Sequence, residues 1–470
     1  MPDKLQKHFY LLGIAIYMMA LLTVSICFKT YALKPLWMVW GIGTVCLFFL
    51  ATYYFHQRWK NDAEKAFCRK IFWVALGIRA VYVTAILYYY YYQTGIGMEY
   101  QAADSLTYHR TAAYLSNMAR EGHIRQIMQL LNANTMGFSD QAYILYLTTL
   151  YSLFGKNILG PRLLKALMSA YMCIAIYQLT ARSLGQKTGR LAAVIAVFLP
   201  QFIHYTGTYM KETELIFLAT LSLERFDYII RCKKHLPWNL TLVIILTALT
   251  FGMRTVVGMI LLGSYTVFVL TADKELINQK TRWIILGALG VMAALLFITP
   301  IGREMRIIFM VNFKESEYQV YKYKALGLKY AEYASYKTMW PGAFVLPLTN
   351  MVEVANENQK MMNGTYFIKN YLAFFAMWSL VVAIRDKKWR SLGLIGSYTV
   401  AYILMIAFSF AFNSERYHLP AMPGIIILTA FTMTRFRKKD FPFYYAFCLL
   451  LCAAIITWNY IKLTGRGIIF

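Results

Sequence analysis

The side chains in this sequence best suited to chemistry are charged and lie beside long apolar runs. They form four clusters, which are Asp104 with His109, then Lys211, Glu212 and Glu214, then Arg254, and finally Glu415, Arg416, Tyr417 and His418. A charge at membrane depth is costly and is therefore usually paired or functional. Pairing, for example of Glu212 with Arg254, would explain any one cluster alone. Because the topology derived below places all four clusters on one side of a membrane, we favour a shared functional site.

A single carboxylate beside several cations suits a transfer reaction in which a phosphate leaves. Asp104 could take the proton of an acceptor hydroxyl, which typically contributes roughly 10²–10⁴-fold in rate. Cations of the other clusters could hold the phosphate and neutralise its developing charge. These cations are Lys211, Arg254, Arg416 and His418. A phosphate leaves as a stable anion, so the acid that glycosidases need is not required. Nucleotide donors are cytoplasmic, so a site on the outer side favours a membrane-borne donor such as a sugar linked to a polyprenyl phosphate.

The composition is that of a membrane protein. Of the 470 residues, 59% are hydrophobic and 15% are charged. Soluble domains carry roughly 25% charged residues, and the apolar stretches of about 18 or more residues that recur here are typical of transmembrane helices. The formal net charge is +26. Its basic residues lie in short clusters between apolar runs, which indicates the positive-inside pattern and attraction to anionic lipids rather than nucleic-acid binding.

The basic loop over residues 56–70 fixes the orientation of the first spans. It follows spans at 9–28 and 36–55, and the positive-inside rule makes it cytoplasmic, as is the N-terminus. A third span at 71–92 then leads out to an extracytoplasmic loop at 93–157.

This outer loop should contain helices that do not cross the membrane. We expect one amphipathic helix that reaches about Arg120 and a second around 124–131. The apolar run 142–154 is too short to cross and should lie at the interface or dip into it. If it crossed, the basic clusters that follow would fall outside, against the positive-inside rule.

The pattern predicts an all-α polytopic membrane protein with about 13 transmembrane helices and amphipathic helices in the first large extracytoplasmic loop. The remaining spans are expected at 158–181, 191–205, 213–230, 238–252, 256–270, 283–299, 366–384, 392–412, 419–434 and 443–461. We divide the chain into an N-terminal hairpin with its cytoplasmic loop, a catalytic transmembrane module, a polar extracytoplasmic loop and C-terminal helices. Their ranges are 1–70, 71–300, 301–365 and 366–470. The polar loop is either an amphipathic surface segment or a lid that binds the acceptor.

Several stretches, taken in order, resemble the GT-C superfamily of integral-membrane glycosyltransferases. The branch with protein O-mannosyltransferases and the lipid A aminoarabinose transferase is the most similar. The resemblance is carried by Asp104 with Tyr108 and Ala112, then 143–155, 161–167, 177–185, 189–193, Pro200, 209–212, and finally 414–423. It covers about residues 100–260 and 413–430. Each motif is degenerate alone, and their order is the specific signal.

The resemblance implies transfer of a sugar, with inversion, from a polyprenyl-phosphate donor on the outer face of the membrane. It implies that Asp104 is the catalytic carboxylate. Where the family usually has a second acid, Lys211 precedes Glu212 here, and we assign that role to Glu212. Some relatives hold a divalent metal between these two acids and others do not, so a metal cofactor on Asp104 and Glu212 is left open.

The other residues of the four clusters are expected to bind substrate. They are Tyr108, His109, Lys211, Arg254, Arg416, Tyr417 and His418. The expected partners are the polyprenyl-phosphate-linked sugar, membrane lipids and an acceptor that is a lipid, a protein or a glycan. The expected location is the cytoplasmic (inner) membrane of a bacterium, with the site facing outward.

Two other functions are alternatives to a glycosyltransferase. An O-antigen or exopolysaccharide polymerase or ligase would use a polyprenyl-diphosphate glycan and would centre its chemistry on Arg416 and His418 rather than on Asp104. A lipid or glycan transporter usually shows internal repeats and broken helices at the membrane midplane. The sequence shows no such repeat, and its polar clusters are predicted at the outer face.

Overall fold

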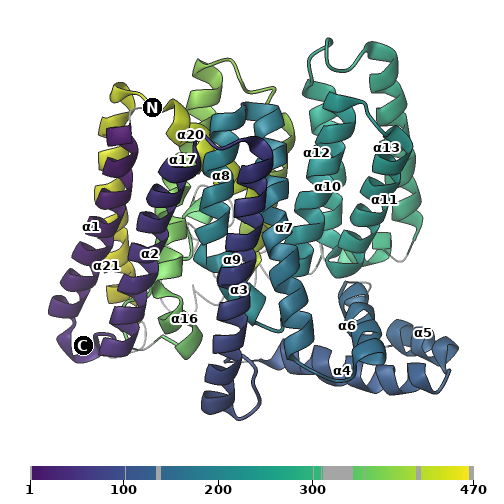
Figure 1. Ribbon diagram of the computed structural model, residues 1–470, viewed down its shortest axis with the longest axis horizontal. Helices are drawn as coiled ribbons and strands as arrows, with labels where there is room; N and C mark the ends of the chain where they lie inside the picture. The colour runs from purple at the N-terminus through teal and green to yellow at the C-terminus, as the bar shows by residue number, and fades with distance from the viewer. Residues whose placement is uncertain are drawn as a thin grey trace.

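The computed structural model describes residues 3–100, 102–133, 139–299, 301–307, 310, 342–353, 355–408 and 414–464. These residues form a bundle of roughly parallel helices with a shorter group of helices across one end (Figure 1). The described residues contain no β-strand. The predicted fold class, an all-α polytopic membrane protein, is confirmed.

Each predicted span falls on a helix of the bundle. These helices are α1 (Asp3–Cys27), α2 (Pro35–Trp59), α3 (Glu64–Thr94), α7 (Leu159–Leu184), α8 (Gln186–Phe198), α10 (Glu212–Cys232), α11 (Leu236–Met253), α12 (Thr255–Thr271), α13 (Gln279–Ile298), α17 (Asn363–Arg385), α18 (Gly393–Phe408), α20 (Met422–Arg435) and α21 (Phe441–Thr464). Short elements connect them, namely η1 (Lys29–Tyr31), α9 (Pro200–Gly207), η2 (Gly342–Phe344), α16 (Glu357–Met361), α19 (Glu415–His418), η4 (Leu419–Ala421) and η5 (Lys438–Asp440).

Eight of the helices in the described part of the chain are long and apolar enough to cross a membrane, and two shorter ones, α12 and α18, are also apolar. The other three expected spans differ for physical reasons. Helices α8 and α20 have 13 and 14 residues and are buried along most of their length, so they pack inside the bundle. Helix α10 has 21 residues, but acidic and basic side chains at both of its ends lower its hydropathy.

The span expected at 191–205 is broken at Pro200, which ends α8 and begins α9. Proline has no N–H to give to the carbonyl four residues earlier. That carbonyl, of Ala196, instead accepts a hydrogen bond of 3.1 Å from Arg79 Nη2, and Val197 accepts one of 3.1 Å from Arg79 Nη1. The fully buried Arg79 of α3 therefore satisfies the broken helix end.

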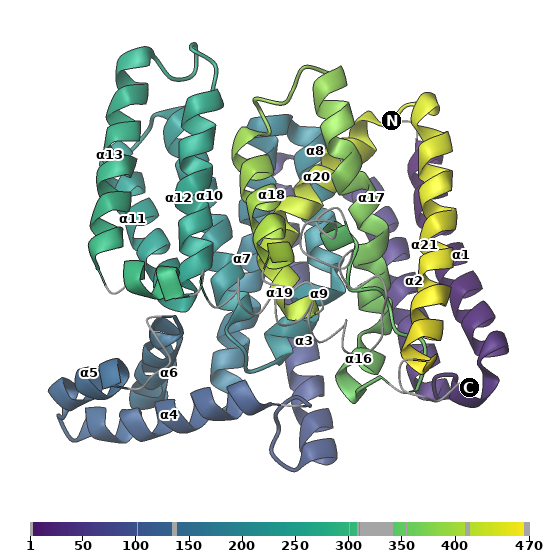
Figure 2. The same ribbon diagram turned by 180° about the vertical axis from the view of Figure 1, so that it is seen from behind.

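The helices of the outer loop lie at the end of the bundle that is opposite the N-terminus (Figures 1 and 2). They are α4 (Ala103–Arg120), α5 (Ile124–Ala133) and α6 (Gln141–Phe154). One face of α4 is buried through Ser105, Tyr108, Ala112 and Leu115, a spacing of three to four residues that defines one side of a helix. Helix α6 has 14 residues, or about 21 Å at 1.5 Å per residue, which is short of a bilayer core of about 30 Å.

The chain alternates between the two ends of the bundle in the order that the sequence predicted. The turns that join α2 to α3, α7 to α8, α10 to α11, α12 to α13, α17 to α18 and α20 to α21 lie at the end that carries the N-terminus (Figure 1). These turns hold the basic clusters used to orient the chain. The elements that carry the four polar clusters, α4, the α9–α10 turn, the α11–α12 junction and α19, lie towards the opposite end.

Candidate active site

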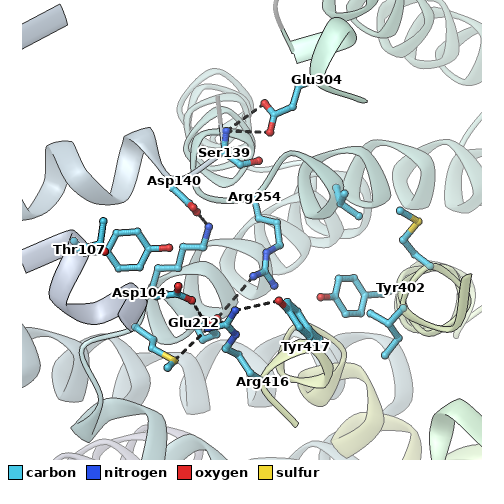
Figure 3. A pocket seen from close by; sticks show the side chains of 16 residues that line it. Asp104, Thr107, Ser139, Asp140, Glu212, Arg254, Glu304, Tyr402, Arg416 and Tyr417 are labelled. Carbon is cyan, nitrogen blue, oxygen red and sulfur yellow. Dashed lines mark hydrogen bonds and ion pairs between the residues drawn. The ribbon is translucent and has the colours of Figure 1, made fainter. Parts of the chain in front are cut away.

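A cavity of about 610 Å³ lies where these elements meet. Most of the predicted site residues line it, namely Asp104, Tyr108, Lys211, Glu212, Arg254, Arg416 and Tyr417. They come from four separate segments of the chain, and their side chains converge (Figure 3). The structure therefore brings the four polar clusters to one place.

The local backbone explains how these side chains reach the cavity. Asp104 lies in the first turn of α4, and Glu212 is the first residue of α10. Arg254 is the single extended residue between α11 and α12, with φ −160° and ψ 107°. A Cβ atom on Gly252 would lie 2.7 Å from Cβ of Ala142, so glycine at this position lets α6 approach the end of α11. This close approach brings the α11–α12 junction beside the outer loop.

Arg416 bridges the two predicted catalytic acids. Its Nη1 donates to Asp104 Oδ2 at 2.5 Å, and its Nε lies 3.6 Å from Glu212 Oε1. Its Nη2 donates to the hydroxyl of Tyr417 at 3.0 Å. The side chain of Asp104 is 49% exposed, whereas that of Glu212 is 2% exposed. The two acids thus differ in access, because only Asp104 is open to a substrate in the cavity.

A second guanidinium approaches the buried acid from the other side. Arg254 Nη2 lies 3.8 Å from Glu212 Oε1, the same oxygen that faces Arg416. The guanidinium groups of Arg254 and Arg416 lie 5.2 Å and 5.0 Å from the ring centroid of Tyr417. Glu212 and Tyr417 therefore hold two cations side by side on one wall of the cavity (Figure 3).

Burial and the neighbouring charges decide the protonation states of three side chains in the site. Burial and then the positive charge of Arg254 lower the pKa of Lys211 to about 7, although the negative charge of Glu212 opposes the shift. Burial alone would lower the pKa of Arg416, but the charge of Glu212 raises it, so this guanidinium stays charged. Burial and the charge of Glu212 raise the pKa of Tyr108, so its hydroxyl stays neutral and can donate.

The cavity also has residues that the sequence did not single out as site residues, among them Thr107, Ser139, Asp140, Glu304 and Tyr402. Asp140 pairs with Lys211, whose Nζ also donates to the carbonyl of Met253 at 2.6 Å. The N–H of Ser139 donates to both carboxylate oxygens of Glu304 at 3.2 Å. Serine and aspartate directly before an apolar helical run often mark the start of a helix, and this is the signal that could have singled out Ser139 and Asp140. Much of the predicted polar loop 301–365, including 311–341, lies outside the described residues.

The two histidines expected to bind substrate do not line the cavity. His109 follows Tyr108 on α4 and therefore points about 100° away around the helix, towards α6. Its Nδ1 lies 2.7 Å from the hydroxyl of Tyr151, and its ring packs against Tyr209. His418 is fully buried at the end of α19. A direct contact of either histidine with a substrate in this cavity is therefore not supported by their placement.

The acids left open as metal ligands do not fit a divalent ion in this arrangement. Asp104 and Glu212 face each other across the guanidinium of Arg416, which occupies the position where a bridging cation would stand. Among the residues that the structure describes, no three His, Cys, Asp or Glu side chains form a group that could hold a metal.

An apolar groove of about 360 Å³ adjoins the cavity between α12 and α18. Val256 and Met405 line both the cavity and the groove. Glu304 lines the cavity, and the next residue, Met305, lines the groove. Small residues such as Gly263 and Ala401 form part of the groove and are exposed on the side of the bundle. An apolar chain that lies along α12 would therefore end beside Arg254.

Comparison with known proteins supports the predicted resemblance. A search of curated proteins gave no match. Residues 141–301, which run from α6 to the segment after α13, match the family described as dolichyl-phosphate-mannose-protein mannosyltransferase. This family is one of the GT-C superfamily, so the resemblance predicted from the sequence is confirmed. By this match over about a third of its length and by its apolar helices, the chain is similar to the GT-C membrane glycosyltransferases.

Proposed function

We propose that this protein transfers a sugar from a polyprenyl-phosphate donor to an acceptor hydroxyl, with inversion, on the extracytoplasmic side of the membrane. The family match supports a membrane glycosyltransferase that uses a donor of this kind. The observation that carries the proposal is the meeting of one accessible carboxylate, Asp104, with Arg416, Arg254 and Lys211 in a cavity continuous with an apolar groove.

The groove and the cations suggest how the donor lies. Its polyprenyl chain would occupy the groove between α12 and α18, and its phosphate would meet Arg254 at the mouth of the cavity. Arg416 offers a second guanidinium, and two such groups can bind phosphate oxygens through charge-assisted hydrogen bonds. The sugar would then extend towards Asp104, Thr107 and Tyr108 on α4.

The ion pair between Asp104 and Arg416 gives the donor a direct role in preparing the base. In the structure the guanidinium of Arg416 donates to Asp104 Oδ2 at 2.5 Å and so occupies the oxygen that would take the proton. A donor phosphate competes for the same guanidinium. Once Arg416 turns to the phosphate, Asp104 is free to accept a proton, so the base becomes active when the donor is in place.

The transfer step is a single displacement. The acceptor oxygen forms a bond to the anomeric carbon and gives its proton to Asp104, while the bond from that carbon to the phosphate oxygen breaks. The electron pair leaves with polyprenyl phosphate, whose negative charge Arg254 and Arg416 stabilise. Attack opposite to the leaving phosphate inverts the anomeric configuration, and no covalent sugar–protein intermediate is needed.

The outward orientation of the site rests on the basic turns. They lie at the opposite end of the bundle from the cavity and should face the cytoplasm. A bacterial inner membrane with the site facing outward fits this arrangement. The polymerase or ligase alternative would centre on Arg416 and His418, but only Arg416 lines the cavity.

The proposal is tested by Asp104→Asn in purified protein supplied with a polyprenyl-phosphate sugar and candidate acceptors. Loss of a general base predicts a fall in kcat of roughly 10²–10⁴-fold, with donor binding retained. Asp273→Asn is the control, because Asp273 also pairs with an arginine, Arg390, but lies on the turn between α12 and α13. Transfer by Asp104→Asn at the wild-type rate would refute the assignment of the base.

A further inference from the structure

Two buried lysines stand directly behind the candidate site. Lys165 of α7 and Lys369 of α17 are fully buried, and each lies 3.5 Å from a glutamate that is almost fully buried. The glutamate paired with Lys165 is Glu214, two residues after Glu212. The glutamate paired with Lys369 is Glu415, the residue before Arg416. A buried lysine–glutamate ion pair therefore occurs next to each of two cavity residues that are far apart in the sequence.

Lys165 holds the turn that carries Lys211 and Glu212. Its Nζ donates to the carbonyl of Thr208 at 3.2 Å and to the carbonyl of Met210. From the other side, the buried carboxylate of Glu99 accepts the N–H of Tyr209 at 3.1 Å. A cation thus binds the carbonyls of the segment 208–210 and an anion binds an N–H group within it, so the turn is fixed by both kinds of backbone group.

Lys369 holds the short helix that carries Arg416. Its Nζ donates to the carbonyl of Leu346 as well as pairing with Glu415. Glu415 Oε1 also accepts a hydrogen bond of 3.2 Å from Gln201 Nε2, which donates at 2.9 Å to the carbonyl of Thr365. Helix α19 has only four residues, and these polar contacts tie it to α9 and α17.

Stability alone does not explain these pairs. Removing two charges from water is costly, and an apolar pair of similar size is often as stable as a buried ion pair or more so. What an ion pair supplies and an apolar pair does not is a fixed direction for the backbone groups that it binds. At Lys165, the backbone so fixed leads within two residues to Lys211 and Glu212. At Lys369, the ion pair fixes the side chain of Glu415, the residue before Arg416.

We propose that Lys165 and Lys369, through Glu214 and Glu415, are positioning residues for the transfer reaction. Lys165 fixes the positions of Lys211 and Glu212, and Lys369 fixes the position of Arg416. This inference rests on the proposed function, since the reaction is what the positions serve. Neither lysine lines the cavity, so neither is expected to touch the substrate.

The test replaces each pair with apolar residues, so that no charge is left buried alone. The variants are Lys165→Met with Glu214→Leu, and Lys369→Met with Glu415→Leu. The matched control is Arg385→Met with Asp440→Leu. Arg385 pairs with Asp440 at 2.9 Å and donates to a backbone carbonyl, that of Arg435, but lies at the other end of α17. All three double variants are first checked for folding by size-exclusion chromatography and thermal unfolding in detergent.

Two measurements then separate local order from reaction. Hydrogen exchange followed by mass spectrometry should show faster exchange in 208–213 for the Lys165 pair and in 414–419 for the Lys369 pair. Donor turnover should show kcat lowered by about 10–100-fold in both, because a displacement near 1 Å can cost about 10²-fold. The Lys369 variant should also bind polyprenyl phosphate more weakly, since Arg416 is misplaced, while the control changes none of these values.

The outcomes are distinct. Folded variants with unchanged exchange, or with faster exchange but wild-type kcat, would overturn the positioning roles. If the wild-type protein transferred no sugar from any polyprenyl-phosphate donor, the proposed function would fail. In that case, polyprenyl phosphate binding and the exchange rates would still show whether the two lysines hold their segments.

Discussion

The two ends of α10 carry acidic residues in contrasting surroundings. Near its C-terminal end, Glu224 lies 2.8 Å from Arg182 and 2.9 Å from Arg225, and Asp227 lies 3.0 Å from Arg182 and 2.7 Å from Arg231. At its N-terminal end, Glu212 lies 3.6 Å and 3.8 Å from two guanidiniums that share one of its oxygens. The short, distributed contacts are those of a structural ion-pair network. The longer, shared contacts leave the guanidiniums able to bind another anion.

Among the changes that test this comparison, Arg416→Ala should have the largest effect on activity. This change removes the proposed phosphate-binding guanidinium, which also bridges Asp104 and Glu212, so kcat/KM for the donor should fall by about 10²–10³-fold. Turnover of a radiolabelled donor measures the effect. Arg182→Ala at the other end of α10 should instead lower thermal stability and leave kcat/KM of the folded protein within about twofold. Equal losses of activity in the two variants would show that the two clusters do not differ in function.

A subtler comparison pairs Glu212→Gln with Glu224→Gln. Both changes remove one buried negative charge from α10 and keep the shape of the side chain. Glu212 lies 3.6 Å and 3.8 Å from the two guanidiniums, so the change removes their shared charge–charge contact and should raise the donor KM by roughly 10–100-fold. Glu224→Gln should alter the midpoint of thermal unfolding instead. A larger effect of Glu224→Gln on KM would reverse the assignment.

The N-terminal end of α10 should also make the donor KM depend on pH, because Lys211 has a pKa lowered to about 7 by burial and by Arg254. Below this pH Lys211 is charged and attracts phosphate, and above it the charge is lost, so the donor KM should rise several-fold between about pH 6 and 8. The phosphodiester donor is the right probe, since a phosphate monoester itself titrates near pH 6. In Lys211→Met the rise should disappear. A rise of the same size in that variant would exclude Lys211 as its source.

The smallest expected effect is that of metal removal. Since a guanidinium stands between Asp104 and Glu212, EDTA should change turnover by less than about twofold. Assays with EDTA and with added Mg²⁺ or Mn²⁺ measure this. Strong stimulation by either metal would mean that Arg416 leaves the acids when substrate binds.

Much of the fold could be predicted because long apolar runs and basic turns leave few alternatives in a membrane. The gathering of Asp104, Arg254 and Arg416 was predicted for the same reason, since each lies beside a span on one side. Partners inside the bundle were harder to predict. Glu214 was grouped with Glu212, yet residues two apart on a helix point in nearly opposite directions, and Glu214 turns to Lys165 instead of the cavity.

Two other pairings could not be predicted for the same reason. Lys165 was noted only as part of a motif, because pairing across helices depends on how α7 and α10 pack. Asp140 could be recognised as a turn residue, but not as the partner of Lys211, 71 positions further along the chain. Sequence patterns predict which side chains are unusual, whereas the packed structure decides which of them meet.

The groove between α12 and α18 has a consequence for turnover. It opens on the side of the bundle, so a long isoprenoid carrier would never have to be pulled out of the bilayer. Only the sugar and phosphate would move sideways under the outer helices, and the spent carrier would slide back along the same path. The protein would bind only the first few isoprene units. It should therefore transfer sugar from carriers of different lengths at similar rates.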